Sequence, residues 1–212
     1  MITIKIYNGS VYVPTKCGSR FCDEHMESPS CHSLTEAFIK DLSNFKSPKF
    51  FIVREPIEYF YSALKTELLS ELNNYSDDHS YEKINICFNK VLKMMYDDEG
   101  TNHYNKFLYK KIKPHEKHLI FVKLENLSSL VSTIMDKNCF SYNKNEYSHD
   151  ELNYTLSNKF IHDILKNDYI DYYHSFMEEI EKEQEIYKTF DFFIPNHNDV
   201  KELYNRKKIS LI

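Results

Sequence analysis

Two short apolar runs constrain the fold of this chain more than any other feature of its sequence. They are Phe50-Phe51-Ile52-Val53 and Leu119-Ile120-Phe121-Val122, and both contain β-branched residues. Apolar runs of this length without polar alternation are typical of strands that are covered on both faces. A helical pattern follows each run, over 57–72 and over 127–135. Strands that alternate with helices predict an α/β fold with a mainly parallel central sheet flanked by helices.

The N-terminus is predicted to form a β-hairpin. Residues 2–7 alternate between apolar and polar side chains, Asn8-Gly9 follows, and Val11-Tyr12-Val13 forms a second β-patterned run. Asn and Gly both tolerate the positive φ that a tight hairpin turn requires. Ser28-Pro29-Ser30 is predicted to break the chain. Further helices are predicted after Arg20 to about Met26, after the capping-box spacing Ser33-Leu34-Thr35-Glu36, and over 81–96, 156–166 and 169–190.

Length and composition favour an ordered globular protein. The 212 residues suffice for one core and are few for two, so a single domain is predicted over 1–212. A net charge of −5 gives no reason to expect nucleic acid as a partner. No apolar run approaches the roughly 20 residues of a membrane span. The first residues do not resemble a signal peptide, and the 5 cysteines are sparse, so we expect a cytoplasmic protein with reduced thiols.

The first candidate site follows the strand Val11–Val13, where the chain reads Lys16-Cys17-Gly18-Ser19-Arg20 and then turns helical. A turn before a helix presents unpaired backbone N–H groups, and the helix dipole adds to their attraction for an anion. Gly18 allows close approach of a phosphate, Ser19 adds a hydroxyl, and Lys16 adds a positive charge. The order Gly-x4-Gly-Lys-Ser/Thr of nucleoside-triphosphate hydrolases is absent.

The second candidate site follows the strand Phe50–Val53, which ends in Arg54-Glu55-Pro56, with Ser62 further along. Arg54 provides a planar fork that suits phosphate oxygens. Ser62, about two turns into the next helix, is placed to share those oxygens. Ligands of open α/β sheets bind beyond the carboxyl ends of the strands, so both segments are candidate parts of a ligand site.

These two segments, in this order, resemble the cofactor motifs of sulfotransferases that use 3′-phosphoadenosine 5′-phosphosulfate (PAPS). The first resembles the 5′-phosphosulfate loop Lys-x-Gly-Thr/Ser-x, and heparan sulfate 3-O-sulfotransferases also carry an arginine where Arg20 stands. The second resembles the 3′-phosphate motif Arg-[Asp/Glu/Asn]-Pro-x5-Ser. Phe121 to Leu127 is similar to the family's strand ending in Glu-Asp-Leu, and the last predicted helix is similar to its closing helix. Tyr59 departs from the family, since many members have a second arginine there.

The resemblance implies a three-layer P-loop-like fold and an enzyme that moves a sulfuryl group from PAPS to a hydroxyl of a carbohydrate or another small acceptor, leaving adenosine 3′,5′-bisphosphate. It implies that Lys16 neutralises the negative charge on the bridging oxygen as it leaves. It also implies that Arg54 and Ser62 hold the 3′-phosphate and that transfer needs no metal. His32 is the first candidate for the general base, with Glu24, His25, Glu36 and His103 as alternatives. His103 is also a candidate for contact with the acceptor.

Three other interpretations stay open. The chain could be a catalytically silent member of the fold that binds a nucleotide or glycan, or a P-loop-like kinase. A zinc cluster is a further reading of its Cys and His residues, although their spacing matches no standard finger: Cys17, Cys22, His25, Cys31 and His32. The tyrosines at helical spacing are chiefly predicted to be core residues, and Tyr59, Tyr61 and Tyr104 are candidates for the wall of an acceptor cleft.

Overall fold

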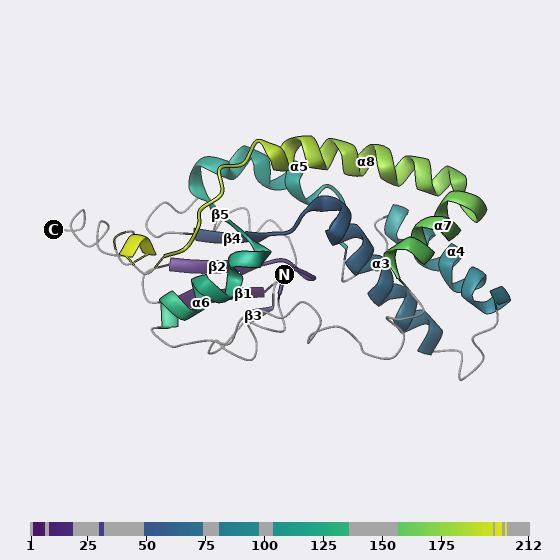
Figure 1. Cartoon of the computed structure of the whole chain (residues 1–212), viewed down its shortest axis with the longest axis horizontal. Helices are drawn as coiled ribbons and strands as arrows, with labels where there is room; N and C mark the ends of the chain where they lie inside the picture. The colour runs from purple at the N-terminus through teal and green to yellow at the C-terminus, as the bar shows by residue number, and fades with distance from the viewer. Residues whose placement is uncertain are drawn as a thin grey trace. The chain divides into compact units, whose positions relative to one another are not determined.

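The computed structural model describes residues 2–6, 9–18, 30–31, 49–73, 81–97, 104–135, 157–196, 198–200 and 202. In this part of the chain the fold is mixed α/β and mostly helical (Figure 1). The elements in chain order are β1 (Ile2–Ile6), β2 (Gly9–Val13), β3 (Ser30–Cys31), β4 (Lys49–Val53), α3 (Pro56–Asn73), α4 (Tyr81–Asp97), α5 (Leu108–Ile112), η1 (Lys113–His118), β5 (Ile120–Lys123), η2 (Leu124–Asn126), α6 (Leu127–Met135), α7 (Asn158–Asp168) and α8 (Ile170–Lys188).

The chain forms two compact units, each assembled from separate stretches of sequence. The first unit comprises Met1–Arg54, Ile112–Tyr147 and Thr189–Ile212. The second comprises Glu55–Lys111 and Ser148–Lys188. The predicted single domain over 1–212 stays a prediction.

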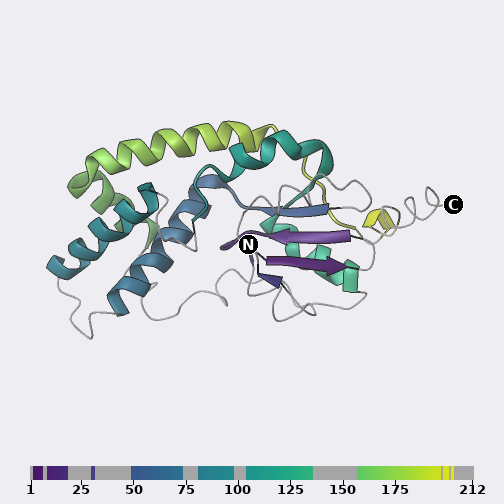
Figure 2. The same cartoon turned by 180° about the vertical axis from the view of Figure 1, so that it is seen from behind.

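The first unit contains a five-stranded sheet in the order β3-β1-β2-β4-β5. The neighbours β2, β4 and β5 are parallel, whereas β1 runs antiparallel to β2, as their opposed arrows show in Figure 2. The register places Val11 beside Phe50, and Phe51 beside Phe121. The parallel pairing of the two apolar runs is therefore confirmed, and it places the carboxyl ends of β2, β4 and β5 at one edge of the sheet.

The N-terminal hairpin is confirmed, but its turn differs from the prediction. The register pairs Ile6 with Gly9, so Gly9 is the first residue of β2 and not a turn residue. Ser30, predicted to lie at a break in the chain, instead begins β3 and pairs with Thr3. A strand of two residues shows no periodicity in the sequence. It therefore could not be predicted without knowing that β1 lies beside it.

The core of the first unit surrounds β4. All five residues of this strand are buried, as expected for a central strand that is covered on both faces. Helix α6 lies over one face of the sheet (Figures 1 and 2) and fully buries Leu127, Leu130 and Val131. Burying one such side chain contributes about 1.5–3 kcal/mol. The packed strands therefore give the loops at their carboxyl ends a rigid base.

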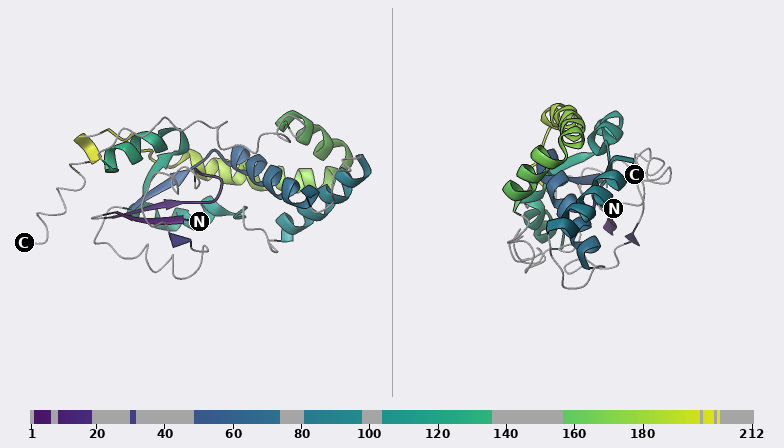
Figure 3. Two further views of the ribbon diagram at one scale, coloured as in Figure 1. Left: turned by 90° about the horizontal axis from the view of Figure 1, so that it is seen from below. Right: turned by 90° about the vertical axis from the view of Figure 1, so that its right-hand side faces the viewer.

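The second unit is a group of helices in which α3 packs on α4 and α8, and α8 also packs on α4 and α7 (Figure 3). Phe60 of α3 and Phe176 of α8 meet in its core with ring centroids 5.0 Å apart. The helices predicted over 57–72, 81–96, 156–166 and 169–190 are confirmed with small shifts of their ends. None of the helices in the described ranges is long and apolar enough to cross a membrane.

Three short helices, α5, η1 and η2, were not predicted, and two predicted helices are untested. Helix α5 and the 3-10 helix η1 occupy 108–118, a lysine-rich stretch whose apolar positions are too few to show a period. The helix predicted after Arg20 and the one opened at Ser33 lie outside the described residues.

Candidate functional site

The loop after β2 adopts an unusual backbone conformation. Lys16 has φ 64° and Gly18 has φ 89°, so both lie in the left-handed region. Glycine enters this region freely, whereas for a lysine it costs roughly 1–2 kcal/mol. The N–H of Cys17 donates to the carbonyl of Pro14 at 3.0 Å and closes a tight turn. The Lys-x-Gly order therefore has a structural basis, because Gly18 relieves one of the two strained positions.

Arg54 joins the two predicted segments. It follows the last residue of β4, and its Nη1 donates to the carbonyl oxygen of Lys16 at 3.0 Å. Since β2 and β4 are neighbouring parallel strands, their carboxyl ends lie side by side, and this contact spans them. The structure thus brings together Lys16, Cys17, Gly18 and Arg54, as the strand-end reasoning predicts.

The side chain of Cys17 points into the core. It is fully buried, and burial raises the pKa of its thiol to about 12, with Arg54 lowering that pKa and Glu125 raising it. The Cys17 N–H donates to the Pro14 carbonyl, and the Cys17 side chain packs in the core. Cys17 therefore attaches the loop to the core of the first unit. A direct contact between Cys17 and a bound phosphate stays a prediction.

We expect Cys17 to resist thiol reagents in the folded protein. The raised pKa keeps the Cys17 thiol protonated at pH 8, and no surface of the residue is accessible. Peptide mapping after iodoacetamide treatment should find Cys17 unmodified in native protein and alkylated in urea. Rapid alkylation of native Cys17 would contradict the buried placement.

The carboxyl end of β5 adds two charged residues that the strand-end reasoning did not single out. Lys123 ends β5 opposite Val53, and its Nζ lies 4.6 Å from the centre of the Phe192 ring. The charge of exposed Glu125 reaches Cys17, as its effect on the Cys17 pKa shows. The sequence could have identified Lys123 and Glu125 as candidates, because both follow a predicted apolar strand, as Lys16 and Arg54 do.

Glu55 and Pro56 have a local structural role at the start of α3. The Glu55 side chain accepts from the N–H of Glu58 at 2.9 Å, and its carbonyl accepts from the N–H of Tyr59 at 2.8 Å. The second carboxylate oxygen accepts from Gln184 at 2.6 Å. Glu55 therefore caps the helix and Pro56 occupies its first position, where a missing N–H is harmless. This accounts for the Glu-Pro part of the predicted motif without a ligand.

Ser62 and the tyrosine candidates belong to the second unit. Ser62 is half-buried in α3, and its sharing of a phosphate with Arg54 stays a prediction. Tyr59 is buried, stacks on Tyr104 with centroids 5.6 Å apart, and its hydroxyl accepts from the N–H of Asn105 at 3.0 Å. Tyr61 is buried as well. These three tyrosines are core residues, in agreement with the main reading of the sequence.

Several predicted site residues lie outside the described residues. They include two members of the loop, the first candidate base and its alternatives, and the candidate for acceptor contact: Ser19, Arg20, Glu24, His25, His32, Glu36 and His103. The structure therefore describes the donor side of the predicted site in part, and the predicted general base stays a prediction.

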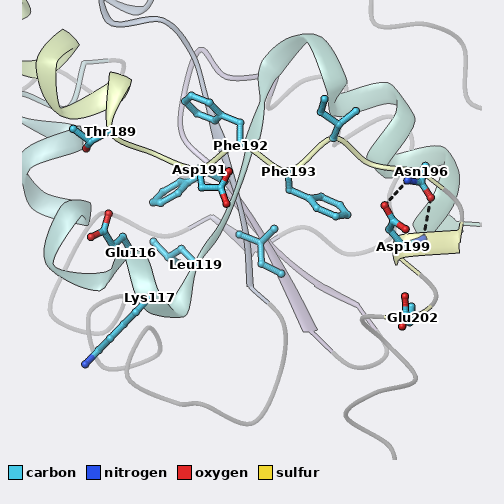
Figure 4. A pocket seen from close by; sticks show the side chains of 13 residues that line it. Glu116, Lys117, Leu119, Thr189, Asp191, Phe192, Phe193, Asn196, Asp199 and Glu202 are labelled. Carbon is cyan, nitrogen blue, oxygen red and sulfur yellow. Dashed lines mark hydrogen bonds between the residues drawn. The ribbon is translucent and has the colours of Figure 1, made fainter.

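The first unit also has a cavity of about 870 Å³ beside the amino half of β5 (Figure 4). Its lining includes Leu119, Phe121 and Phe193. It also includes four carboxylates and one lysine: Glu116, Asp191, Asp199, Glu202 and Lys117. The net negative charge of these side chains repels an anionic nucleotide. Neither Lys16 nor Arg54 lines this cavity, so it is separate from the candidate site at the carboxyl ends of the strands.

Comparison of the chain with family models, with curated proteins and with solved structures finds no match.

Proposed function

We propose that this chain is a sulfotransferase of P-loop-like, three-layer fold that binds PAPS and moves its sulfuryl group to a hydroxyl. The observation that carries the proposal is the hydrogen bond from Arg54 to the Lys16 carbonyl. It joins a Lys-x-Gly-Ser loop and an Arg-Glu-Pro segment at the carboxyl ends of adjacent parallel strands. Sequence order, strand context and this contact support the proposal that both segments belong to one donor site.

The chemistry of the described residues fits a nucleotide with two separate phosphates. Lys16, in the loop after β2, and Arg54, directly after β4, contribute one cation each, and the absence of a Cβ at Gly18 leaves room for close approach of an oxyanion. A guanidinium has five N–H donors, so an arginine can hold a carbonyl and an anion together. Lys16 would bind the 5′ side, and Arg54, with Ser62, the 3′-phosphate.

The donor would supply an activated sulfuryl group, and the chain would stabilise charge and move a proton. In this proposal Lys16 neutralises the oxygen of the leaving phosphate as its charge develops, which is a preorganised electrostatic role. His32 would accept the proton of the attacking hydroxyl, with Glu24, His25, Glu36 and His103 as alternatives. A sugar hydroxyl is the proposed acceptor, and His103 is proposed to contact it.

Binding of the reaction product tests the donor half of this proposal. We expect adenosine 3′,5′-bisphosphate to raise the melting temperature, because a ligand that binds only the native state stabilises it. ATP should have a smaller effect, since the Gly-x4-Gly-Lys loop is absent. The measurement is a thermal shift of wild-type protein over a concentration series of each nucleotide.

The matched controls are Arg54→Ala and Lys117→Ala. The first removes the guanidinium, and we expect it to abolish the response to the bisphosphate. The second removes an exposed lysine from the lining of the separate cavity and should leave the response unchanged. A wild-type protein that ignores the bisphosphate, or that responds to ATP alone, would overturn the proposed function.

A further inference from the structure

The peptide group between Lys16 and Cys17 is held on both sides. Its carbonyl oxygen accepts from Arg54 Nη1 at 3.0 Å, and its N–H donates to the Pro14 carbonyl at 3.0 Å. A trans peptide is planar, so its C=O and N–H point in opposite directions. Two contacts at its opposite ends therefore fix the orientation of the whole plane.

This orientation needs external support because of the backbone of Lys16. With φ 64°, Lys16 occupies a conformation that an L-residue with a Cβ adopts only at a cost, and such strain persists when the surroundings hold it. Pro14 belongs to the same turn, so its contact is local. Arg54 directly follows β4, so its hydrogen bond to the Lys16 carbonyl ties the loop after β2 to the neighbouring strand.

We propose that Arg54 is a positioning residue for the 5′ side of the donor site in addition to its proposed role at the 3′-phosphate. By holding the Lys16 carbonyl, Arg54 maintains the turn that directs the Lys16 side chain and the Gly18 backbone toward a 5′-phosphate. The two ends of the nucleotide are thereby coupled through one guanidinium. This inference rests on the proposed function, because it assigns the loop to the 5′ side of a donor.

Nucleotides with a single phosphate separate the two roles of Arg54. Adenosine 5′-monophosphate has no 3′-phosphate, so an arginine that serves only as a 3′-phosphate ligand has no effect on its affinity. An arginine that also positions the loop changes that affinity. Adenosine 3′-monophosphate is the matching probe for the other end.

The experiment measures the Kd of both monophosphates and of adenosine 3′,5′-bisphosphate by calorimetry for wild type, Arg54→Met and Arg54→Lys. Arg54→Met keeps an unbranched stem without donors, and we expect it to weaken 5′-monophosphate binding by about tenfold or more, a typical effect of losing a charge-assisted contact. Arg54→Lys keeps one donor for the Lys16 carbonyl and should recover part of this loss. Melting temperatures of all variants report general damage to the fold, and Arg54→Lys serves as the measured variant if Arg54→Met does not fold.

The outcomes distinguish this inference from the proposed function. If wild type binds the bisphosphate, and Arg54→Met weakens the bisphosphate and the 3′-monophosphate but not the 5′-monophosphate, the positioning role is overturned and the donor site stands. If both substitutions weaken 5′-monophosphate binding equally, with no recovery in the lysine variant, the hydrogen bond to Lys16 is not the cause and the inference fails. If wild type binds none of the three nucleotides, the proposed function fails and this inference fails with it.

Discussion

Replacing Lys16 with alanine is expected to lower the rate of sulfuryl transfer by about two to three orders of magnitude, the usual effect of removing one preorganised charge at a transition state. The negative charge on the leaving oxygen develops during the reaction. A contact to that oxygen therefore contributes more to the transition state than to the bound nucleotide. Accordingly, the affinity for adenosine 3′,5′-bisphosphate should fall by a smaller factor than kcat.

The measurement is release of adenosine 3′,5′-bisphosphate from PAPS in the presence of a panel of sugar and phenolic acceptors. Lys117→Ala is the matched control, since it removes an exposed lysine of the same unit away from the strand ends. Equal losses of kcat and affinity in Lys16→Ala would contradict the electrostatic role. Tight bisphosphate binding by wild type without turnover on any acceptor would favour the silent binding protein instead.

Replacing Glu183 with alanine is expected to destabilise the second unit by about 2–6 kcal/mol. The buried carboxylate of Glu183, on α8, accepts from the N–H of Tyr109 at 2.7 Å and from the N–H of Lys110 at 3.1 Å. These are backbone donors at the start of α5, which have no partner inside their own helix. Glu183→Ala removes the acceptor of both hydrogen bonds, and each such loss costs about 1–3 kcal/mol.

Urea unfolding measures this loss, with Glu185→Ala as the matched control. Glu185 lies on the same helix and forms an exposed ion pair with Lys188, a type of pair that contributes about 0–1 kcal/mol. Similar unfolding free energies for the two alanine variants would contradict the capping role of Glu183.

The same carboxylate has a pH signature with a definite sign. Burial raises the pKa of Glu183 above its ordinary value of 4.5, although the hydrogen bonds from Tyr109 and Lys110 and the charge of Lys111 lower it. The native state therefore holds this proton more tightly than the unfolded state. The contribution of Glu183 to stability is greatest below pH 4.5 and declines as the pH rises from 4.5 through the raised pKa.

Glu183→Gln removes this titration while keeping an oxygen that can accept from the same amides. Between pH 4.5 and neutral pH, the unfolding free energy of wild type should therefore fall relative to that of the glutamine variant. Urea unfolding of both proteins across this range gives the comparison. A difference that stays constant with pH, or that changes in favour of wild type as the pH rises, would show that the pKa of Glu183 is not raised.

Much of the fold could be predicted because the spacing of apolar residues along the chain indicates which side chains of a helix or strand are buried. The run Phe50–Val53 has no polar face, and the structure buries every residue of β4. The predicted hairpin and the helices α3, α4, α7 and α8 also follow from patterns of neighbouring residues. The strand β3 and the helix α5 could not be predicted, since two and five residues contain too little pattern to distinguish them from a loop.

For the candidate site, strand order was the deciding information. Lys16 and Arg54 could be assigned to strand ends from the sequence, and a parallel sheet predicts that those ends meet. Their hydrogen bond, however, depends on β2 and β4 being direct neighbours, which no local pattern specifies. Likewise, the sequence presents Glu55 as part of a ligand motif, whereas the structure shows it capping α3.

The sequence by itself determined the residue types of the proposed donor site: a lysine and a glycine after one strand, and an arginine after another. Those choices are visible in the chain because the chemistry of an anion site depends on which side chains are present. Only the tertiary structure decided how they meet, since the burial of Cys17 and the hydrogen bond from Arg54 to the Lys16 carbonyl depend on residues far apart in sequence. Such contacts form when separate strands pack together, and that packing is a property of the folded chain as a whole.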